Sequence, residues 1–336
     1  MIRKGQRLGK YRIEERLGTG GFATVYGARD TVEGIPVALK IPHRAIVTQD
    51  TLQMFRKEVR IAAVLDHPNI LLLKNAEFIG ERFVIAHPRG KETLAQRLKR
   101  RMSLKTSLNF ASPILEALSY AHRCGIIHCD IKPENFVIFD NDQLRLTDFG
   151  VAKVALSTRT IVASGSGTIA YMAPEQAFGK PSFASDVFSA GLVIYEMFSR
   201  ELLEWPFPWP GPGYERLLKE THRDFVAFLK RSLELSHHRR YRDAQQMLGA
   251  FNRIRPRVLR CKQRRNNPGM AASPDWQQVR YREFKRRYGA RFKIRHHCTR
   301  CGGPTSETMQ LVHKHTDSAQ TYRPPSTSVW GLRKSR

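Results

Sequence analysis

The segment that most constrains this chain is a short charged loop between two apolar runs, "IIHCDIKPENFVIF" at residues 126–139. Within six residues it contains Asp130, Lys132, Glu134 and Asn135. The flanking runs are apolar enough to be buried, and a charge beside a buried segment costs free energy unless it is paired or hydrogen-bonded. The segment is therefore either a capped turn with incidental charges or a loop whose charges perform chemistry.

The length of 336 residues allows a two-lobed domain with an additional segment, because single cores rarely grow beyond about 250–300 residues. The chain has 57 Lys and Arg against 30 Asp and Glu, a formal charge of +27. Much of that excess lies in residues 252–336, which hold 21 Lys and Arg and 4 Asp and Glu. The composition thus predicts a main body followed by a strongly basic tail.

The cysteines and the apolar runs indicate where the chain folds. Five cysteines, an odd and sparse set, favour a reducing compartment over a disulfide framework. The first residues lack the apolar core of a signal peptide, and the nearly apolar run at 190–198 is too short to cross a bilayer. We therefore expect a soluble, cytoplasmic protein that does not contact membranes.

The hydrophobic pattern changes along the chain. Residues 11–85 read mostly as short strands, namely "YRIEERLG", "TVYGARD", "PVALKIP" and "FVIAH", interrupted by one helix over 51–65. Beyond about residue 103 long helices are predicted over 103–125 and 184–198, with short strands at "FVIF" and "LRLTD" between them. The fold class is therefore α+β, with a small β-rich lobe and a larger helical lobe.

A glycine-rich stretch, "LGTGGFATVYGARD", begins at Leu17. Gly18, Gly20 and Gly21 would let backbone N–H groups approach an anion without a Cβ in the way, although such clusters are also common in plain hairpin turns. The strand "VALK" ends at Lys40, which could meet phosphate oxygens, and Glu58 in the following helix could orient it. Each of these charges could also be an ordinary solvated one.

Three further motifs follow in order. They are "LTDFGVAK", which contains Asp148, then "GTIAYMAPE" at 167–175 and "SDVFSAG" at 185–191. With them, residues 11–251 resemble the eukaryotic-type, or Hanks-type, serine/threonine protein kinase family, with an N-lobe over about 11–86 and a C-lobe over about 90–251. "DIKPEN" and Thr168 resemble the Ser/Thr branch of that family rather than the Tyr branch.

The resemblance implies a bilobal fold and the transfer of the γ-phosphate of Mg·ATP to Ser or Thr hydroxyls of proteins. Asp130 would orient the substrate hydroxyl and Lys132 would steady the transferred group. Asn135 and Asp148 would bind Mg²⁺, and Lys40, held by Glu58, would grip the phosphates. The residues implied for ATP binding are Leu17, Gly18, Gly20, Gly21, Val25, Ala38, Lys40, Ala86, His87, Arg89 and Val137.

Within that set, Val25, Ala38 and Val137 would sandwich the adenine. Ala86 would be the gatekeeper and would leave the rear of the pocket open, and residues 87–89 would be the hinge whose backbone bonds the adenine edge. Away from the nucleotide, Glu175 and Arg240 resemble the buried ion pair of the large lobe. Asp186 resembles the residue that braces the catalytic loop.

The chain departs from the family at Cys129, where most members carry an arginine that can pair with a phosphorylated activation loop. We therefore expect catalysis not to depend on such a phosphate, and the thiol to be a partly buried small hydrophobe rather than a redox sensor. Hydroxyls that could still be autophosphorylated are Ser157, Thr158, Thr160, Ser164 and Ser166.

Residues 252–336 lie outside the resemblance and are expected to be partly flexible. "HHCTRCGG" has the cysteine spacing of half a zinc knuckle, with Cys298 and Cys301 as possible Zn²⁺ ligands. The candidates for the other two ligands are Cys261, His296, His297, His313 and His315. Tyr281, Phe284 and Tyr288 share one face of a possible basic helix, which would pack on the large lobe or form a small core of its own.

The positive charge of the tail suggests nucleic acid or an acidic protein as a partner, or a solvated arm without one. A different class of function also remains for the whole chain, that of a pseudokinase-like scaffold that binds nucleotide or partners without turnover. A small-molecule phosphotransferase would use a similar charged loop, but "GTIAYMAPE" resembles a platform for peptide substrates.

Overall fold

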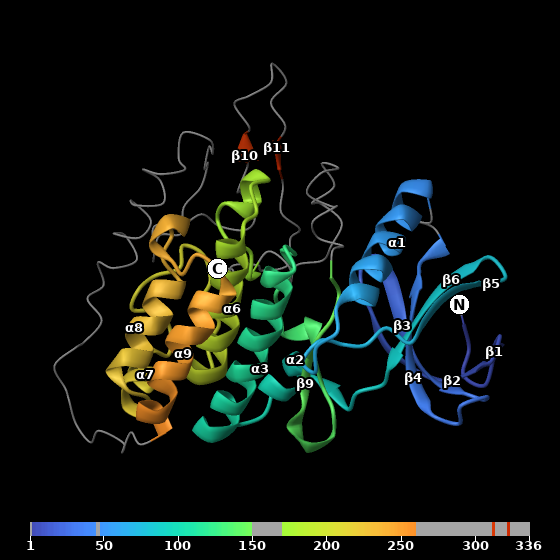
Figure 1. Ribbon diagram of the computed structural model, residues 1–336, viewed down its shortest axis with the longest axis horizontal. Coiled ribbons are helices and arrows are strands. Elements are labelled where there is room, and N and C mark those ends of the chain that lie inside the picture. Colours follow the sequence, from blue (N-terminus) through green and yellow to red (C-terminus); the bar gives the residue numbers. More distant parts are fainter. Residues whose placement is uncertain (1, 45–47, 150–169, 260–310, 313–320, 323–336) are drawn as a thin grey trace, which may run out of the picture.

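The computed structural model describes residues 2–44, 48–149 and 170–259, with two short segments at 311–312 and 321–322. The β-strands and the long helix of the small lobe lie at one end of the molecule, and the other long helices lie at the opposite end (Figure 1). The strands of the main sheet are β1 (Arg7–Leu8), β2 (Tyr11–Thr19), β3 (Ala23–Asp30), β4 (Pro36–Pro42), β5 (Asn75–Ile79) and β6 (Arg82–Pro88).

This sheet is antiparallel, with the strand order β1-β2-β3-β4-β6-β5. Alternation along β4 explains its two faces, since successive side chains of a strand point to opposite sides. Val37, Leu39 and Ile41 are buried in one apolar cluster. Ala38 and Lys40 therefore point to the other face, toward the cleft between the lobes. Helix α1 (Gln49–Val64) packs through Phe55 against Ile85 of β6.

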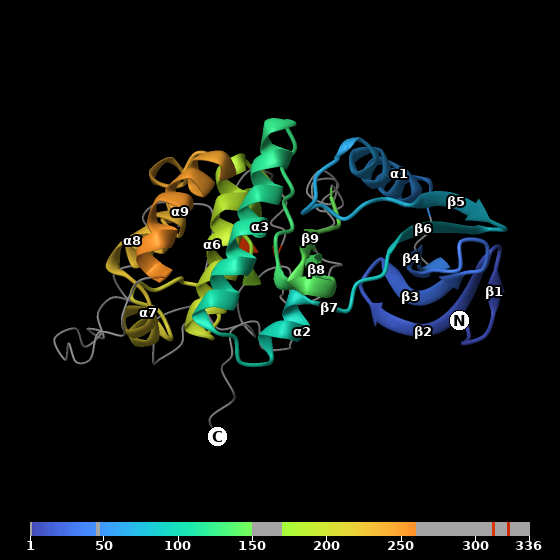
Figure 2. The same ribbon diagram turned by 60° about the horizontal axis from the view of Figure 1, so that its bottom comes forward.

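The large lobe is helical and is built around α3 and α6, which lie next to each other in both ribbon views (Figures 1 and 2). Nearly every side chain of α6 is buried, as its almost continuous apolar sequence predicts. Ser103 caps α3 by accepting a hydrogen bond from the Thr106 N–H. The helices are α2 (Leu94–Leu98), α3 (Leu104–Arg123), α6 (Phe183–Ser199), α7 (Tyr214–Glu220), α8 (Arg223–Ser232) and α9 (Ala244–Leu259).

A second sheet of three short strands lies where the lobes meet, formed by β7 (Glu92–Thr93), β8 (Phe136–Ile138) and β9 (Leu144–Leu146). The segment between α1 and β5 is joined to it, because the Leu71 N–H donates to the Leu146 carbonyl at 2.8 Å. The charged loop of residues 130–135 directly precedes β8. The three-strand sheet therefore fixes the position of that loop relative to both lobes.

Short 3-10 helices and a small ladder complete the described structure. The 3-10 helices are η2 (Pro133–Asn135), η3 (Asp140–Asp142), η5 (Gln176–Phe178) and η6 (His237–Arg239). The ladder joins β10 (Leu311–Val312) to β11 (Thr321–Tyr322). Within the described ranges, no helix has the length and apolar character needed to span a bilayer.

The sequence-based assignment of elements is confirmed. The four predicted strands of the small lobe correspond to β2, β3, β4 and β6, and the three predicted helices correspond to α1, α3 and α6. The predicted β pieces flanking residue 140 correspond to β8 and β9. Helix α9 continues past residue 251, where the resemblance ends, to Leu259 and buries Val258 completely in the core.

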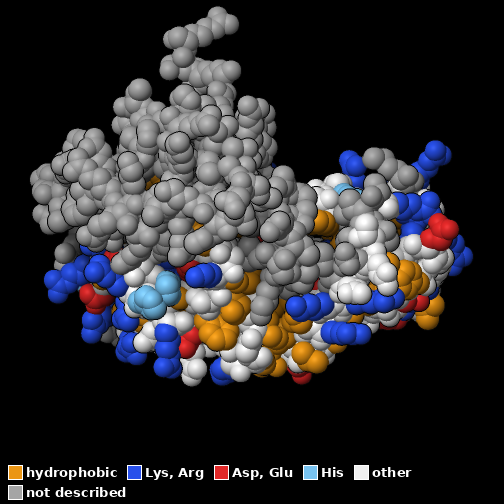
Figure 3. Space-filling view, turned by 90° about the horizontal axis from the view of Figure 1, so that it is seen from above, with side chains coloured by type: hydrophobic (Ala, Val, Ile, Leu, Met, Phe, Trp, Pro, Cys, Tyr) orange, Lys and Arg blue, Asp and Glu red, His pale blue; other side chains and the backbone are white. Residues whose placement is uncertain are grey.

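Basic side chains are spread over the visible face of both lobes rather than gathered on one of them (Figure 3). In the large lobe the notable charged pair is buried instead. Arg240 donates to both carboxylate oxygens of Glu175 at 2.7 and 2.9 Å, and to the carbonyls of Ala184 and Leu235. Both side chains are almost completely excluded from solvent. This confirms the expected buried pair.

Replacing Glu175 with Gln should lower the free energy of unfolding by about 3–5 kcal/mol at pH 7, because Arg240 would stay buried without its partner. Burial alone would raise the pKa of Glu175, but Arg240 holds that pKa below its ordinary value of 4.5. The stabilisation is therefore present above pH 4.5 and is lost as the pH falls through the lowered pKa. Urea unfolding of both proteins at a series of pH values measures this.

The matched control is Glu81→Gln, which removes an exposed ion pair with Arg44 and should change stability by about 0.5 kcal/mol or less. If Glu175→Gln were as mild as this control at pH 7, the buried pair would not stabilise the large lobe as argued.

Candidate active site

Lys40 joins the two lobes at the cleft. Its Nζ donates to Glu58 Oε1 of α1 at 2.7 Å and to Asp148 Oδ1, in the segment that follows β9. The side chains of Lys40 and Glu58 are mostly buried. One ammonium group therefore holds together the sheet, its helix and the large lobe, and the sequence-based pairing of Lys40 with Glu58 is present in the structure.

The protonation states at this site follow from burial and charge. Burial alone would lower the pKa of Lys40, but the carboxylates of Asp148 and Glu58 raise it above its ordinary value. Burial alone would raise the pKa of Asp148, but Lys40 holds it well below its usual range. For Glu58, burial outweighs the attraction of Lys40 and raises the pKa to about 7. Lys40 and Asp148 are thus the charged pair of this site at neutral pH.

The charged loop forms a compact polar unit. Lys132 Nζ lies 2.8 Å from Asp130 Oδ2, and Asn135 Nδ2 donates to the same oxygen at 3.0 Å. Asn135 Nδ2 also donates to the Asp130 carbonyl at 2.7 Å. These bonds orient the Asp130 carboxylate and leave its Oδ1 as an acceptor for another group.

Asp186 of α6 anchors the backbone of this loop. Its Oδ2 accepts from the His128 N–H at 2.8 Å and its Oδ1 from the Cys129 N–H at 2.9 Å. His122 accepts from the Ala244 N–H through Nδ1, so its Nε2–H donates to Asp186 Oδ2 at 3.0 Å. The expectation that Asp186 braces the loop is confirmed, and His122 is a supporting residue that the motifs did not reveal.

Cys129 is the strained residue of the loop, with a φ of +67° in the left-handed region that side chains other than glycine rarely adopt. Gln176 Nε2 donates to its carbonyl at 2.8 Å, so hydrogen bonds hold both its N–H and its carbonyl. Its side chain is buried, as expected for a small hydrophobe, with Sγ 3.7 Å from the Ile127 carbonyl. The surrounding structure therefore maintains the strain.

Asp148 is also left-handed, with a φ of +65°, and its neighbour Phe149 packs edge-on against His128 with ring centroids 4.8 Å apart. His128 Nε2 donates to the Thr147 carbonyl at 2.9 Å while its Nδ1 accepts from the Asp130 N–H. His128 therefore links the segment after β9, which carries Asp148, to the loop that carries Asp130. Residues 18 positions apart in sequence are fixed side by side.

The donor set suits a magnesium ion. Asn135 is buried, and its Nδ2 donates both of the described hydrogen bonds of its amide. Its Oδ1 is therefore the atom that can bind a cation. Asp148 uses Oδ1 on Lys40 and retains Oδ2. Hard carboxylate and amide oxygens are the ligands Mg²⁺ prefers, and it keeps waters in its remaining positions. Asn135 and Asp148 thus fit the expected metal.

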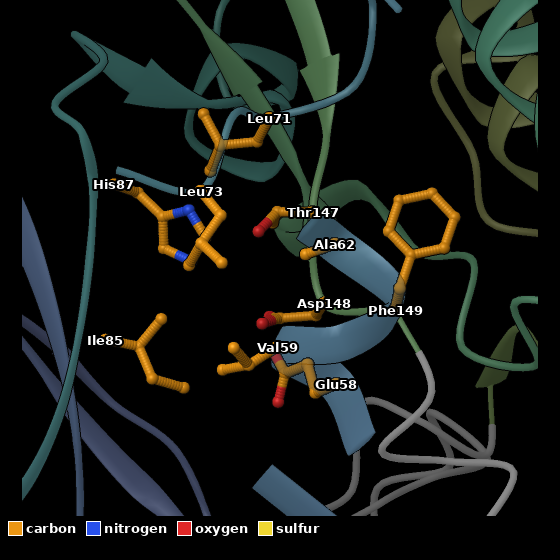
Figure 4. A pocket seen from close by; sticks show the side chains of 10 residues that line it. All are labelled: Glu58, Val59, Ala62, Leu71, Leu73, Ile85, His87, Thr147, Asp148 and Phe149. Atoms are coloured by element: carbon orange, nitrogen blue, oxygen red, sulfur yellow. The ribbon is translucent and has the colours of Figure 1, made fainter. Parts of the chain in front are cut away.

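The pocket beside Lys40 is drawn in Figure 4 and lies between α1, β6 and the segment after β9 that carries Asp148. Its walls include Glu58 and Ala62 of α1, Ile85 and His87 of β6, and Asp148. The register of the sheet explains this lining, because β4 pairs Lys40 with Ile85 and Ala38 with His87. Residues directly opposite each other in an antiparallel pair share a face.

The expectation that Ala86 is the gatekeeper is therefore wrong. Ala86 pairs with Leu39 and lies in the apolar cluster on the opposite face of the sheet. His87, expected in the hinge, instead points its ring into the rear of the pocket (Figure 4). On this register a hinge would begin at Pro88, one residue later than predicted. No family motif marks this segment, so the sequence alone did not fix its register. A shift of one residue places every side chain of the strand on the opposite face of the sheet.

The side chain of Arg89 has a role that sequence reasoning missed. It donates through Nη1 to Glu14 at 3.2 Å and through Nη2 to Glu15, so it ties the hinge to β2. A Cβ on Gly27 of β3 would lie 2.8 Å from Arg89 Nη1, so a larger residue there would displace the guanidinium group. A signal was available, since acidic pairs such as Glu14 and Glu15 often face a basic residue.

The glycine-rich stretch forms the hairpin between β2 and β3. Gly18 pairs with Val25, and the Gly20 N–H donates to the Ala23 carbonyl at 2.9 Å. A Cβ on Gly18 would meet nothing within 4 Å. The loop backbone is therefore open to an approaching group. Leu17, which is 40% exposed, stands at the edge of this loop.

Several expected residues lie outside the described residues. They are the activation-loop hydroxyls Ser157, Thr158, Thr160, Ser164 and Ser166, with Thr168, and the tail residues Cys261, Tyr281, Phe284, Tyr288, His296, His297, Cys298, Cys301, His313 and His315.

The protein kinase domain profile matches residues 11–251, and this chain belongs to the protein kinase family. Among its curated relatives, serine/threonine-protein kinase PknA of Mycobacterium tuberculosis is 36% identical over 217 residues, covering 61% of this chain and 49% of the relative. A probable serine/threonine-protein kinase of Clostridium acetobutylicum is 34% identical over 194 residues, covering 56% of this chain and 30% of the relative.

This chain thus spans a third to a half of the length of those relatives. The crystal structure of the M. tuberculosis PknI kinase domain superposes with a TM-score of 0.60 at 21% identity, covering 75% of this chain and 99% of that structure. The likeness to PknI supports the two-lobed fold.

Replacing Gly90 with Ala should disturb the floor of the cleft. A Cβ there would lie 2.2 Å from Val137 Cγ1 and 2.9 Å from the Ile138 carbonyl. We expect a loss of about 1–3 kcal/mol in stability from overpacking, together with weaker nucleotide binding because Val137 is displaced. Thermal unfolding and nucleotide titration measure the two effects.

Gly249→Ala in α9 is the control, because a Cβ there meets only Arg253 at 3.9 Å and alanine favours a helix by about 1 kcal/mol. A Gly90→Ala protein with unchanged stability and affinity would contradict the close contact described here.

Proposed function

We propose that this chain is a serine/threonine protein kinase that transfers the γ-phosphate of Mg·ATP to hydroxyl groups of protein substrates. One observation carries the proposal. The side chains of Lys40, Asp130, Asn135 and Asp148 come from three separate stretches of sequence, which are joined by the Lys40–Asp148 contact and by the hydrogen bonds of His128. The names of the curated relatives support the Ser/Thr specificity.

The geometry suggests how the residues divide the work. Phosphoryl transfer needs mainly positioning and charge neutralisation, so a rigid set of charges suffices. Asp130, held by Lys132 and Asn135, accepts a hydrogen bond from the incoming hydroxyl and takes its proton as the oxygen attacks the γ-phosphorus and the bond from that phosphorus to the departing ADP breaks. Lys132 then lies beside the transferred group, and Lys40 neutralises phosphate oxygens. Magnesium held by Asn135 and Asp148 would supply further positive charge at the phosphates.

The adenine would lie against Val25, Ala38 and Val137, in a slot closed at the rear by His87. Gly18, Gly20 and Gly21 would cover the phosphates, with Leu17 at the entrance. With the register found here, the hinge atoms that face the adenine edge are the Pro88 carbonyl and the Gly90 N–H.

Asp130→Asn and Lys40→Met should each reduce phosphorylation of casein or myelin basic protein by at least about 100-fold, the loss typical for a missing proton acceptor or charge clamp. Radiolabelled ATP gives the rates. Asp140→Asn, which removes an exposed partner of Lys91, is the control and should leave the rate unchanged. In a pseudokinase-like scaffold, none of the three substitutions would change the amount of radiolabel transferred.

We also propose that activity does not require a phosphate on the activation loop. The side chain at position 129 is a buried thiol, which cannot pair with a phosphate as an arginine would. Its backbone is held by Asp186 and Gln176 instead, so the loop is ordered without that pairing. Enzyme treated with a protein phosphatase should keep most of its activity relative to mock-treated enzyme, and loss of most activity would contradict this.

The basic tail is a separate proposal. Residues 252–336 would attract a nucleic acid or an acidic protein, and Cys298 with Cys301 would contribute half of a Zn²⁺ site. Neither feature is needed for phosphoryl transfer, because the residues assigned to it lie between 17 and 148. We place the protein in the cytoplasm, in keeping with its sparse cysteines.

A further inference from the structure

His87 lies on the wall of the slot that the proposed function assigns to the adenine, and its ring also lines the neighbouring pocket drawn in Figure 4. It is buried, at 9% exposure, and lies on β6 opposite Ala38. A histidine here is chemically distinctive, because the other β6 side chain lining the pocket, Ile85, is purely apolar. Its ring brings a polar nitrogen beside the apolar side chains of Ile85 and Leu73.

A hydrogen bond fixes the tautomer of this ring. His87 Nδ1 lies 2.9 Å from the Leu72 carbonyl, which can only accept, so Nδ1 carries the proton. Burial lowers the pKa of His87, so the ring is neutral at pH 7. In the neutral ring Nε2 is then a lone-pair acceptor, and the described part of the chain gives it no hydrogen-bond partner.

We propose that His87 Nε2 accepts a hydrogen bond from the exocyclic amino group of the nucleotide base and thereby selects a 6-aminopurine. The neighbouring residues define where the base sits, since Ala38 on the paired strand lies over it and Lys40, two residues further along, reaches the phosphates. The edge of the base nearest His87 is therefore the one remote from the sugar and phosphates. The selection rests on the proposed function.

The chemistry predicts an order among three purine nucleotides. ATP presents an N–H donor to Nε2. The triphosphate of purine riboside, which has hydrogen in place of the amino group, presents nothing. GTP presents a carbonyl oxygen, which would face the lone pair of Nε2, and the Leu72 carbonyl prevents the ring from switching to the other tautomer. Affinity should therefore fall in the order ATP, purine riboside triphosphate, GTP.

The test compares the dissociation constants of these three nucleotides with Mg²⁺ for the full chain and for His87→Leu, His87→Met and His87→Gln. The measured quantity is the dissociation constant of purine riboside triphosphate divided by that of ATP. This ratio should be about five- to tenfold larger in the wild type than in the Leu and Met variants, which corresponds to the loss of one hydrogen bond. The Gln variant keeps an acceptor and should retain part of the preference. Thermal unfolding confirms that each variant is folded.

Equal ratios in wild type and in the Leu or Met variant would overturn the proposal. If neither apolar variant folds, ¹⁵N-histidine spectra of the wild type decide. The Nε2 resonance of one neutral histidine should move upfield with ATP but not with purine riboside triphosphate, and an unchanged spectrum would overturn the proposal too. Failure of the proposed function looks different, because then no nucleotide binds or the Asp130→Asn variant phosphorylates as well as the wild type.

Discussion

The contact of Lys40 with Glu58 and Asp148 is the interaction on which the arrangement of the cleft depends. Its three members come from the sheet, the helix of the small lobe and the large lobe. Burial makes the contact selective, since a mostly buried ammonium is tolerated only with carboxylates beside it. The position of α1 against the sheet is therefore coupled to the position of Asp148.

The raised pKa of Glu58 shows how finely this contact is balanced. Two carboxylates share one ammonium, and burial disfavours the second negative charge, so the pKa of Glu58 rises to about 7. A bound triphosphate would add negative charge at the same ammonium. The three-way contact is then a resting arrangement of Lys40, and nucleotide binding would redistribute its bonds rather than create a new site.

Much of the fold and of the site could be predicted from the sequence because both are encoded locally. Alternation marked β2, β3, β4 and β6, and the charged loop identified Asp130, Lys132 and Asn135 by residue type. Cys129 in the same loop takes part through its backbone, which bonds to Asp186 and Gln176, and it needs no charged side chain for those bonds. What local sequence could not supply was the register of β6 against β4. A shift of one residue moved Ala86 to the far face and brought His87 into the pocket.

The buried polar groups that anchor the charged loop differ from the one that faces the cleft beside Lys40. In the large lobe, Arg240, Glu175 and Asp186 are satisfied by hydrogen bonds within the protein, so they fix one backbone arrangement and hold the strained peptide of Cys129. On the side of the cleft formed by the small lobe, Glu58 Oε2 is buried without a hydrogen-bond partner in the described structure. Buried groups of this kind cost free energy in the free protein. A ligand that brings the complementary donor recovers that cost, and the cleft is where such a ligand would bind.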